Sequence, residues 1–87
     1  MSLSAIDFDG SILRLLDQRK LPSVTSYVNC STASETAAAI TAMVVRGAPA
    51  IGITAAYGMA MAQKNGEDLE KAEQVLIYVL IFIFCKL

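Results

Sequence analysis

The sequence predicts an α+β fold in which a small N-terminal β-hairpin or sheet is followed by a bundle of helices. Three observations predict this class. An Asp-Gly pair separates two short apolar runs, a capping pattern at residues 32–35 opens an alanine-rich stretch, and Pro49 and Asn65-Gly66 bracket a second apolar stretch. The length of 87 residues allows one small domain, or part of one, and no second core.

The first expected elements are two short strands within residues 5–16. Ile6 and Phe8 lie on one side of the first run, and Asp9-Gly10 follows it. Asp-Gly favours the positive φ angles of a tight turn, so the pattern predicts a hairpin. Tyr27-Val28 predicts a third short strand.

The first helix is expected to begin after Thr32, whose hydroxyl can accept from a free backbone N–H while Glu35 reaches back. Apolar residues recur at helical spacing from Ala33 to Val44. Gly47 follows them and is expected to end this helix, because glycine adopts the left-handed conformation at little cost.

A second helix is expected to begin at Pro49, because proline suits the first helical turn, and to end at Asn65-Gly66. Its small and apolar residues predict a buried helix that other elements approach closely. Acidic residues at 67–70 then suit the positive end of a third helix. The apolar stripe of that helix is expected to comprise Leu69, Ala72, Val75 and Leu76.

Composition excludes several classes of function. The formal net charge is −1, so the chain lacks the basic excess of a nucleic-acid-binding surface. Histidine is absent and the two cysteines, Cys30 and Cys85, cannot form a Cys-rich zinc site or a disulfide scaffold. We therefore expect no metal site, and catalysis by Ser-His-Asp or Cys-His groups is excluded within this chain. Cys30 is expected to be a small, partly buried residue.

The C-terminal segment is unusual, because the eleven residues from Val75 to Cys85 are all apolar. A membrane-spanning helix needs about 20 such residues, so no membrane span is expected. The N-terminus lacks the pattern of a secretory signal, which predicts a cytoplasmic protein, with the nucleus as an alternative. Side chains 77–84 would expose on the order of 1,000 Å² of apolar surface, so the chain alone is expected to be unstable or to associate through them.

The turn Arg46-Gly47-Ala48-Pro49 is where chemistry is expected. The start of a helix presents unpaired N–H groups and a partial positive charge, the glycine lets an anion reach the backbone, and the arginine fork matches phosphate oxygens. A structural interpretation stays open: Gly47 ends one helix, Pro49 begins the next, and Arg46 complements the negative end of the first.

Two motifs carry a family resemblance. RGAPAIG at 46–52 resembles the signature of the methylthioribose-1-phosphate isomerases, and LRLLDQRKLP at 13–22 matches their L-x-x-L-D-Q-x-x-L-P pattern. The segment AAYGMAMA also lies in register. The likeness covers residues 3 to about 76 and places the chain near the initiation-factor-2B alpha/beta/delta-like superfamily.

The resemblance implies an intramolecular oxidoreductase of methionine salvage, an aldose–ketose isomerase that converts 5-methylthioribose 1-phosphate to 5-methylthioribulose 1-phosphate. Arg46, Gly47 and Ala48 match the family's substrate-binding triplet. Members are homodimers that use no metal or organic cofactor, and they join an N-terminal domain of sheet and helices to a Rossmann-like domain. The alternative within the superfamily is a non-catalytic regulatory subunit of the translation-initiation guanine-nucleotide exchange factor.

The chain departs from the family after Leu76. Residues 1–76 are expected to be an incomplete isomerase-like N-terminal domain, and residues 77–87 an apolar tail outside the family pattern. The catalytic cysteine and aspartate of the family lie beyond this region, so the resemblance assigns no catalytic residue to this chain and implies a fragment that is inactive alone. A small membrane-associated peptide is a third interpretation, which depends on the tail only.

Overall fold

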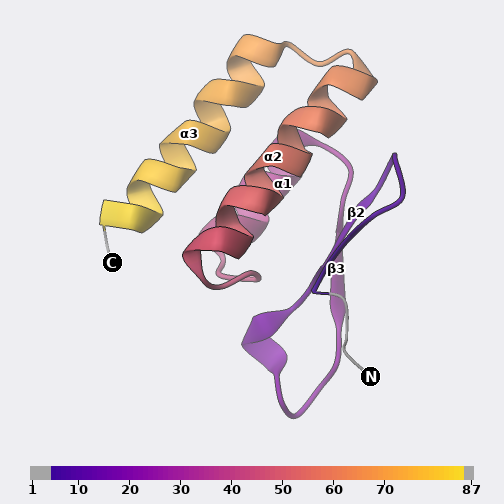
Figure 1. Cartoon of the computed structure of the whole chain (residues 1–87), viewed down its shortest axis with the longest axis vertical. Coiled ribbons are helices and arrows are strands. Elements are labelled where there is room, and N and C mark those ends of the chain that lie inside the picture. Colours follow the sequence, from indigo (N-terminus) through magenta and orange to yellow (C-terminus); the bar gives the residue numbers. More distant parts are fainter. Residues whose placement is uncertain (1–4, 86–87) are drawn as a thin grey trace.

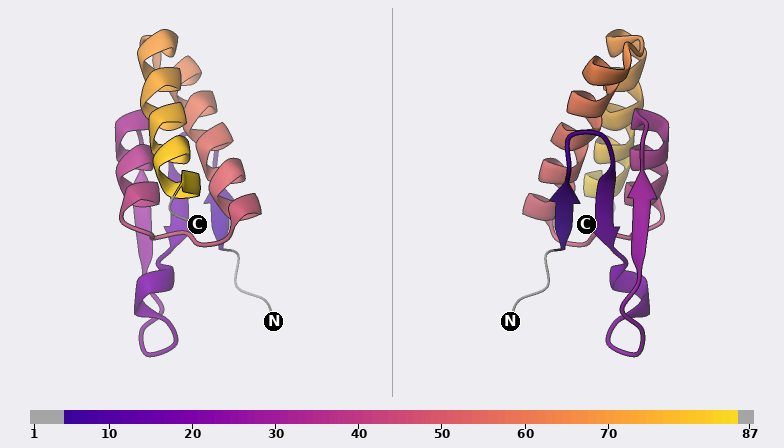
Figure 2. Two further views of the ribbon diagram at one scale, coloured as in Figure 1. Left: turned by 90° about the vertical axis from the view of Figure 1, so that its left-hand side faces the viewer. Right: turned by 90° about the vertical axis from the view of Figure 1, so that its right-hand side faces the viewer.

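The chain folds into three layers: a small sheet, a pair of helices, and one outer helix (Figure 1). The structure is a computed structural model, and it describes residues 5–85. α1 and α2 pack against the sheet, and α3 packs over both of them on the side away from the sheet, as the two side views show (Figure 2). This confirms the predicted α+β class, with the sheet first and the helices after it.

The sheet contains three antiparallel strands in the order β1-β2-β3. The strands are β1 (Ile6–Phe8), β2 (Leu13–Leu16) and β3 (Tyr27–Cys30). The predicted hairpin is confirmed: Gly10 has a φ of 99°, and the Asp9 carboxylate accepts from the N–H groups of residues 11 and 12 at 2.8 Å. Within β2, Leu13 and Leu15 are buried while Arg14 is exposed, because alternate side chains point to opposite faces.

A short 3₁₀ turn, η1 (Gln18–Lys20), leads from β2 toward β3. Asp17 precedes this turn and is 1% exposed. Its carboxylate accepts from the backbone N–H of Arg19 at 3.0 Å and from both arms of the Arg19 guanidinium at 2.9 and 2.8 Å. This forked contact lowers the pKa of Asp17 to about 2.

Helix α1 spans Ala33–Thr41, and its predicted cap at Thr32 is confirmed: the hydroxyl accepts from the Glu35 N–H at 3.1 Å. The Glu35 carboxylate reaches one residue further back than a capping box requires and accepts from the N–H and hydroxyl of Ser31. The helix also ends earlier than predicted. Met43, with a φ of 63°, turns the chain instead of Gly47.

Helix α2 spans Ala48–Asn65 and ends, as predicted, at Gly66, which has a φ of 72°. Pro49 is the second helical residue and not the first. The prediction of a buried helix holds for only one side of α2. Ile51 and Ala55 face the core, whereas Ile53 on the opposite side is 51% exposed. Because α2 lies between the sheet and α3 at one end of its layer, one flank remains open to solvent.

Helix α3 spans Leu69–Cys85 without interruption at residues 76 and 77. Asp68 caps its start by accepting from the N–H groups of residues 70 and 71 at 3.0 and 3.3 Å. Of the predicted stripe, Ala72 and Leu76 are buried, whereas Leu69 and Val75 are 44% and 39% exposed. Val79 and Ile83 continue the buried side, at the helical spacing of about four residues.

The three helices pack closely together at Gly58. A Cβ atom placed on Gly58 would lie 3.0 Å from Cγ2 of Thr36 on α1 and 3.1 Å from Cδ1 of Leu76 on α3. Both neighbours are buried, and the Thr36 hydroxyl is held by a 2.9 Å bond to the Thr32 carbonyl. Glycine is therefore the residue that lets α1, α2 and α3 pack at this separation.

Between residues 5 and 85, no helix has both the length and the apolar character needed to cross a bilayer. Over the same range, no three side chains of the metal-ligating types gather closely enough to hold an ion.

Candidate functional site

The loop between α1 and α2 is anchored in the core immediately before the predicted site. Val44 and Val45 are each 2% exposed, so this part of the loop packs like core sequence. The Val44 carbonyl accepts from the Gln18 N–H at 2.9 Å, which joins the loop to the turn after β2. The burial of both valines and this hydrogen bond fix the position from which residues 46–48 emerge.

Gly47 occupies the cap position of α2, with φ 91° and ψ 133°. Residues with a Cβ atom rarely adopt this conformation. The Gly47 carbonyl accepts the first intrahelical bond, from the Ile51 N–H at 3.0 Å, and no side chain caps the helix. A Cβ atom placed on Gly47 would meet no atom within 4 Å, so the space beside the backbone is open.

The first turn of α2 therefore presents donors to solvent. The N–H groups of Ala48 and Ala50 precede the residues that can bond within the helix, and Pro49 has no N–H. Aligned peptide dipoles place about half a positive charge at this end of an 18-residue helix. An anion beside Gly47 would meet both the dipole and the free donors.

Arg46 is exposed and directly precedes this opening. Among residues 5–85, its guanidinium forms no ion pair or hydrogen bond. The interpretation of Arg46 as a helix-end complement is therefore not supported by a bond to the carbonyls of α1. The predicted residues 46, 47 and 48 lie consecutively at an exposed, uncapped helix start, and this arrangement can bind an anionic group.

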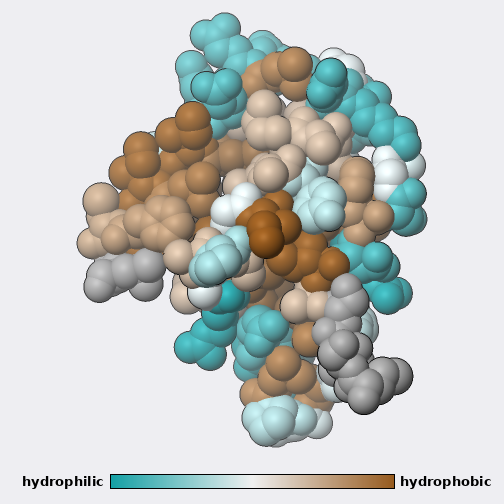
Figure 3. Space-filling view, viewed as in Figure 1, coloured by the Kyte–Doolittle hydropathy of each residue, from teal (hydrophilic) through white to brown (hydrophobic). Residues whose placement is uncertain are grey.

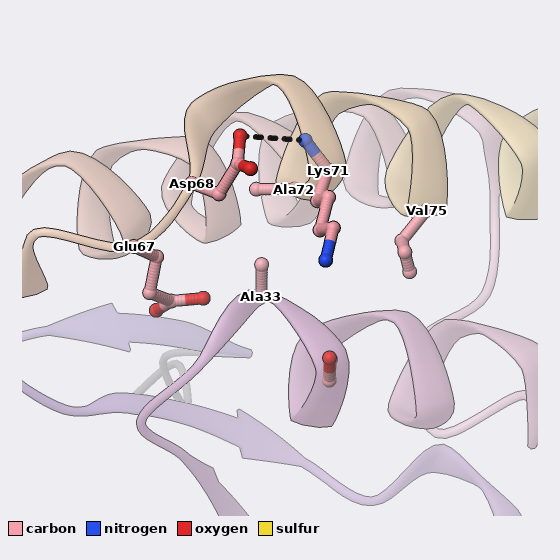
Figure 4. Close-up of a pocket in the computed structure, with 7 residues that line it drawn as sticks. Ala33, Glu67, Asp68, Lys71, Ala72 and Val75 are labelled. Atoms are coloured by element: carbon pink, nitrogen blue, oxygen red, sulfur yellow. Dashed lines mark hydrogen bonds between the residues drawn. The ribbon is translucent and has the colours of Figure 1, made fainter.

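A separate hollow lies between the starts of α1 and α3 (Figure 4). It encloses about 360 Å³ and is open to solvent. The Glu67 carboxylate and the Lys71 amine point into it, with Ala33 below them (Figure 4). Lys71 and Glu67 form no ion pair, and sequence reasoning did not predict this hollow, because its walls come from residues 34 positions apart.

The two cysteines occupy different environments. Cys30 is buried beneath the start of α1, and its thiol donates to the Glu35 carbonyl at 3.7 Å. Burial, and then the charge of Glu35, raise the pKa of the Cys30 thiol, which disfavours the reactive thiolate. Cys85 is exposed at the end of α3. The burial of Cys30 agrees with the role expected from the sequence.

The hydrogen bond between the Gln18 N–H and the Val44 carbonyl was not predicted from the sequence. The two motifs give an indication of this contact, because LRLLDQRKLP contains Gln18 and RGAPAIG begins two residues after Val44. A backbone hydrogen bond thus joins the first motif to the residues that lead into the second.

Comparison with known proteins identifies close relatives over most of the chain. No protein-family model matches it. The methylthioribose-1-phosphate isomerase of Thermus thermophilus is 60% identical over 68 residues, covering 78% of this chain and 21% of that protein. The crystal structure of 5-methylthioribose 1-phosphate isomerase from Pyrococcus horikoshii matches with a TM-score of 0.77 and 31% identity, over 83% of this chain and 23% of that one.

A second similar solved structure belongs to a protein with a different name. Translation initiation factor eIF-2B, subunit delta, from A. fulgidus matches with a TM-score of 0.72 and 34% identity, over 90% of this chain and 24% of that one. This chain spans about a fifth of the length of the curated relatives it matches. The resemblance found in the two motifs is thus confirmed for the region that the chain covers.

Proposed function

We propose that this chain, which resembles part of the methylthioribose-1-phosphate isomerases, is the phosphate-contacting portion of such an enzyme. The proposed reaction is the aldose–ketose conversion of 5-methylthioribose 1-phosphate to 5-methylthioribulose 1-phosphate, a step of methionine salvage. The observation that carries the proposal is the position of the RGAPAIG motif at an uncapped helix start, in a chain 60% identical to an isomerase over 68 residues.

Arg46, Gly47 and Ala48 are proposed to bind the phosphate of the sugar. The guanidinium offers two parallel donors to two phosphate oxygens, and the N–H of Ala48 offers a third at the positive end of α2. Gly47 contributes by leaving space, because a side chain there would stand between the anion and the backbone. The phosphate is attached to C1, one of the two carbons between which the proton moves, so these contacts are proposed to hold the reacting end of the sugar in place rather than to move protons themselves.

We infer that the chain has no activity alone. Isomerisation requires groups that remove and return a proton within hydrogen-bond reach of adjacent sugar carbons. The resemblance places that cysteine and aspartate beyond the region matched by this chain. Incubating the purified chain with 5-methylthioribose 1-phosphate and following ketose formation by NMR tests this inference. Product above a no-protein control would contradict it.

The phosphate site can be tested on the chain itself. Inorganic phosphate and methyl phosphate are titrated while the backbone amide signals are followed by NMR. We expect the largest shifts at Gly47 and Ala48, and their loss in Arg46→Ala. Arg14→Ala is the matched control, because Arg14 is also exposed but lies on the sheet beside Asp7. Equal responses in the two variants would contradict the assignment.

A kinetic test uses a full-length isomerase carrying the same motif. Replacing the arginine that matches Arg46 by alanine removes a charged hydrogen bond worth about 1.5–3 kcal/mol, so KM should rise roughly 10- to 150-fold. Because the contact is made to substrate and transition state alike, kcat should change less. An unchanged KM would contradict the role of Arg46.

We further propose the domain boundary expected from the sequence, with residues 1–76 as the isomerase-like portion and 77–87 as a tail outside the family. The support is the change of composition after Leu76, because residues 77–85 contain no charged residue. A cytoplasmic location is also proposed, and imaging of a C-terminal fluorescent fusion tests it.

A regulatory, non-catalytic role is the second candidate. The match to the delta subunit of eIF-2B, at 34% identity, supports it. A subunit that works through protein contacts does not need an unpaired arginine at an open helix start. Phosphate binding that depends on Arg46 therefore favours the isomerase, and its absence favours the regulatory role.

A further inference from the structure

β3 forms one edge of the sheet, because the strand order is β1-β2-β3. In the antiparallel register Asp17 lies opposite Ser26, and the Asp17 N–H donates to the Ser26 carbonyl at 2.8 Å. Alternate residues of a strand bond to the same neighbour, so the backbone of Val28 also bonds to β2. The N–H and C=O groups of Tyr27 and Asn29 therefore point away from β2. Between residues 5 and 85, no other strand pairs with them.

This edge lacks the features that normally protect an exposed strand. Charged side chains, proline and bulges discourage the pairing of an edge with another chain. β3 contains no charged residue and no proline, and its register with β2 is continuous. The opposite edge, β1, carries the exposed Asp7 at its centre. Of the two edges, β3 is therefore the one that is open to an added strand.

A hollow of about 300 Å³ lies between this edge and α1. β3 lines it with Val28, and α1 lines it with Ala38 and Ala42, which are exposed and one helical turn apart. The two side views place β3 and α1 on the same side of the molecule (Figure 2). Hydrophobic side chains also gather on the surface along α3 (Figure 3), but none of the described residues that line this hollow belongs to α3. A strand added to β3 would direct alternate side chains into the hollow.

Opposite charges lie at the two ends of the hollow, because Arg19 and Glu35 both line it. Arg19 lies near the start of β3, since it follows Asp17, which is hydrogen-bonded to the residue before that strand. Its Nε and Nη2 bind the Asp17 carboxylate, whereas its Nη1 has no partner among residues 5–85. Glu35 lies near the end of β3, where its backbone carbonyl accepts from the Cys30 thiol at 3.7 Å. A ligand in the hollow therefore meets a cation at one end and a carboxylate at the other.

We propose that the β3 edge binds an extended segment of another polypeptide as a fourth, antiparallel strand. The segment carries a basic residue toward Glu35, an apolar residue in the hollow and an acidic residue toward Arg19. An antiparallel strand runs from the Glu35 end to the Arg19 end, so the basic residue comes first in its sequence. Five residues span about 13 Å between their first and last Cα atoms, which covers residues 26–30.

The alternation of a strand gives each of the five residues its role. The first, third and fifth face α1, opposite residues 30, 28 and 26, and the second and fourth form backbone hydrogen bonds with Asn29 and Tyr27. In this mode of recognition the backbone bonds supply affinity, and the alternate side chains supply specificity. The proposal does not depend on the phosphate site.

The test titrates the peptide acetyl-Lys-Thr-Ile-Thr-Glu-amide into the full 87-residue chain and follows the backbone amide signals by NMR. We expect saturable shifts and slowed hydrogen exchange at the Tyr27 and Asn29 N–H groups. The Val28 N–H, which is already bonded to β2, should change less. The peptide with lysine and glutamate exchanged is the matched control. It should bind at least about threefold more weakly, because it satisfies both charges only as a parallel strand.

Backbone pairing is tested by methylating the peptide. N-methylation of the two threonines removes the donors that face β3 and should weaken binding at least about tenfold. N-methylation of the isoleucine alters a donor that points away from β3 and should weaken binding much less.

The hollow is tested by two variants on the exposed side of α1. Ala38→Gln places a longer side chain in the hollow and should weaken binding at least about tenfold. Ser34→Gln lies one turn earlier, beside the hollow that faces α3, and should leave binding within about twofold. Glutamine is a good helix former, and circular dichroism establishes that both variants keep the helical content of the wild type.

Several outcomes would overturn the proposal. Absence of a saturable shift up to about 5 mM peptide would do so, as would equal affinity for the two charge orders. Equal weakening by Ala38→Gln and Ser34→Gln would exclude the hollow as the site. Shifts confined to α3, or pairing of the β3 edges of two copies without peptide, would identify a different surface or a different occupant and would also overturn it.

Discussion

Replacing Gly58 by alanine should destabilise the fold, although alanine is the better helix former. In an unhindered helix position, the change would stabilise by about 1 kcal/mol. The new Cβ atom, however, would lie 3.0 Å from Thr36 Cγ2 and 3.1 Å from Leu76 Cδ1, whereas carbon atoms pack best at about 3.5–4.0 Å. Overpacking of this kind costs about 1–3 kcal/mol, so we expect a net loss of about 1 kcal/mol.

Gly52→Ala is the matched control, because it lies on the same helix and its Cβ would meet no atom within 4 Å. It should stabilise by about 0.5–1 kcal/mol. Thermal unfolding followed by circular dichroism should therefore separate the variants by roughly 6–16 °C, with Gly58→Ala lower. Thr36→Ser removes the nearest carbon and should recover part of the loss. A Gly58→Ala variant that melts as high as Gly52→Ala would refute the close packing of the three helices.

The remaining predictions concern local contacts. The contact with Arg19 holds the pKa of Asp17 at about 2, below its ordinary value of 3.8. The resulting stability is present above that ordinary value and is lost as the pH falls through 2, and Arg19→Ala should flatten this acid dependence in urea titrations. Thr32→Ala removes the cap of α1 and should lower the free energy of unfolding by about 1 kcal/mol. Maleimide should label Cys85 well before Cys30, as mass spectrometry of timed samples would show, and equal rates would contradict the burial of Cys30.

Local chemistry was sufficient to predict the elements that depend on neighbouring residues. The hairpin at Asp9-Gly10, the cap at Thr32 and the stop at Gly66 each require only a few adjacent positions, and all three are confirmed. The end of α1 could not be found in this way. Met43 adopts the left-handed conformation at the point where Val44 and Val45 pack into the core. The local sequence pattern does not show this packing.

The residues of the candidate site could be predicted from the sequence, but their place in the fold could not. Arg46, Gly47 and Pro49 indicated an open helix start, and the structure adds that Gly47 begins α2 instead of ending α1. Apolar periodicity likewise gave no measure of how much of α2 and α3 would remain exposed. That depends on how the helices are layered, and among residues 5–85 nothing covers the exposed sides of Ile53 and Ile81.

The bond between the Gln18 N–H and the Val44 carbonyl makes the turn after β2 a mechanical support for the loop that carries Arg46. A proline at position 18 would delete this donor without altering any side chain near residues 46–48. Evolutionary or engineered changes in the first motif should therefore be accompanied by adjustment in the second. A design that transfers the RGAPAIG segment to another scaffold should therefore also transfer the turn after β2.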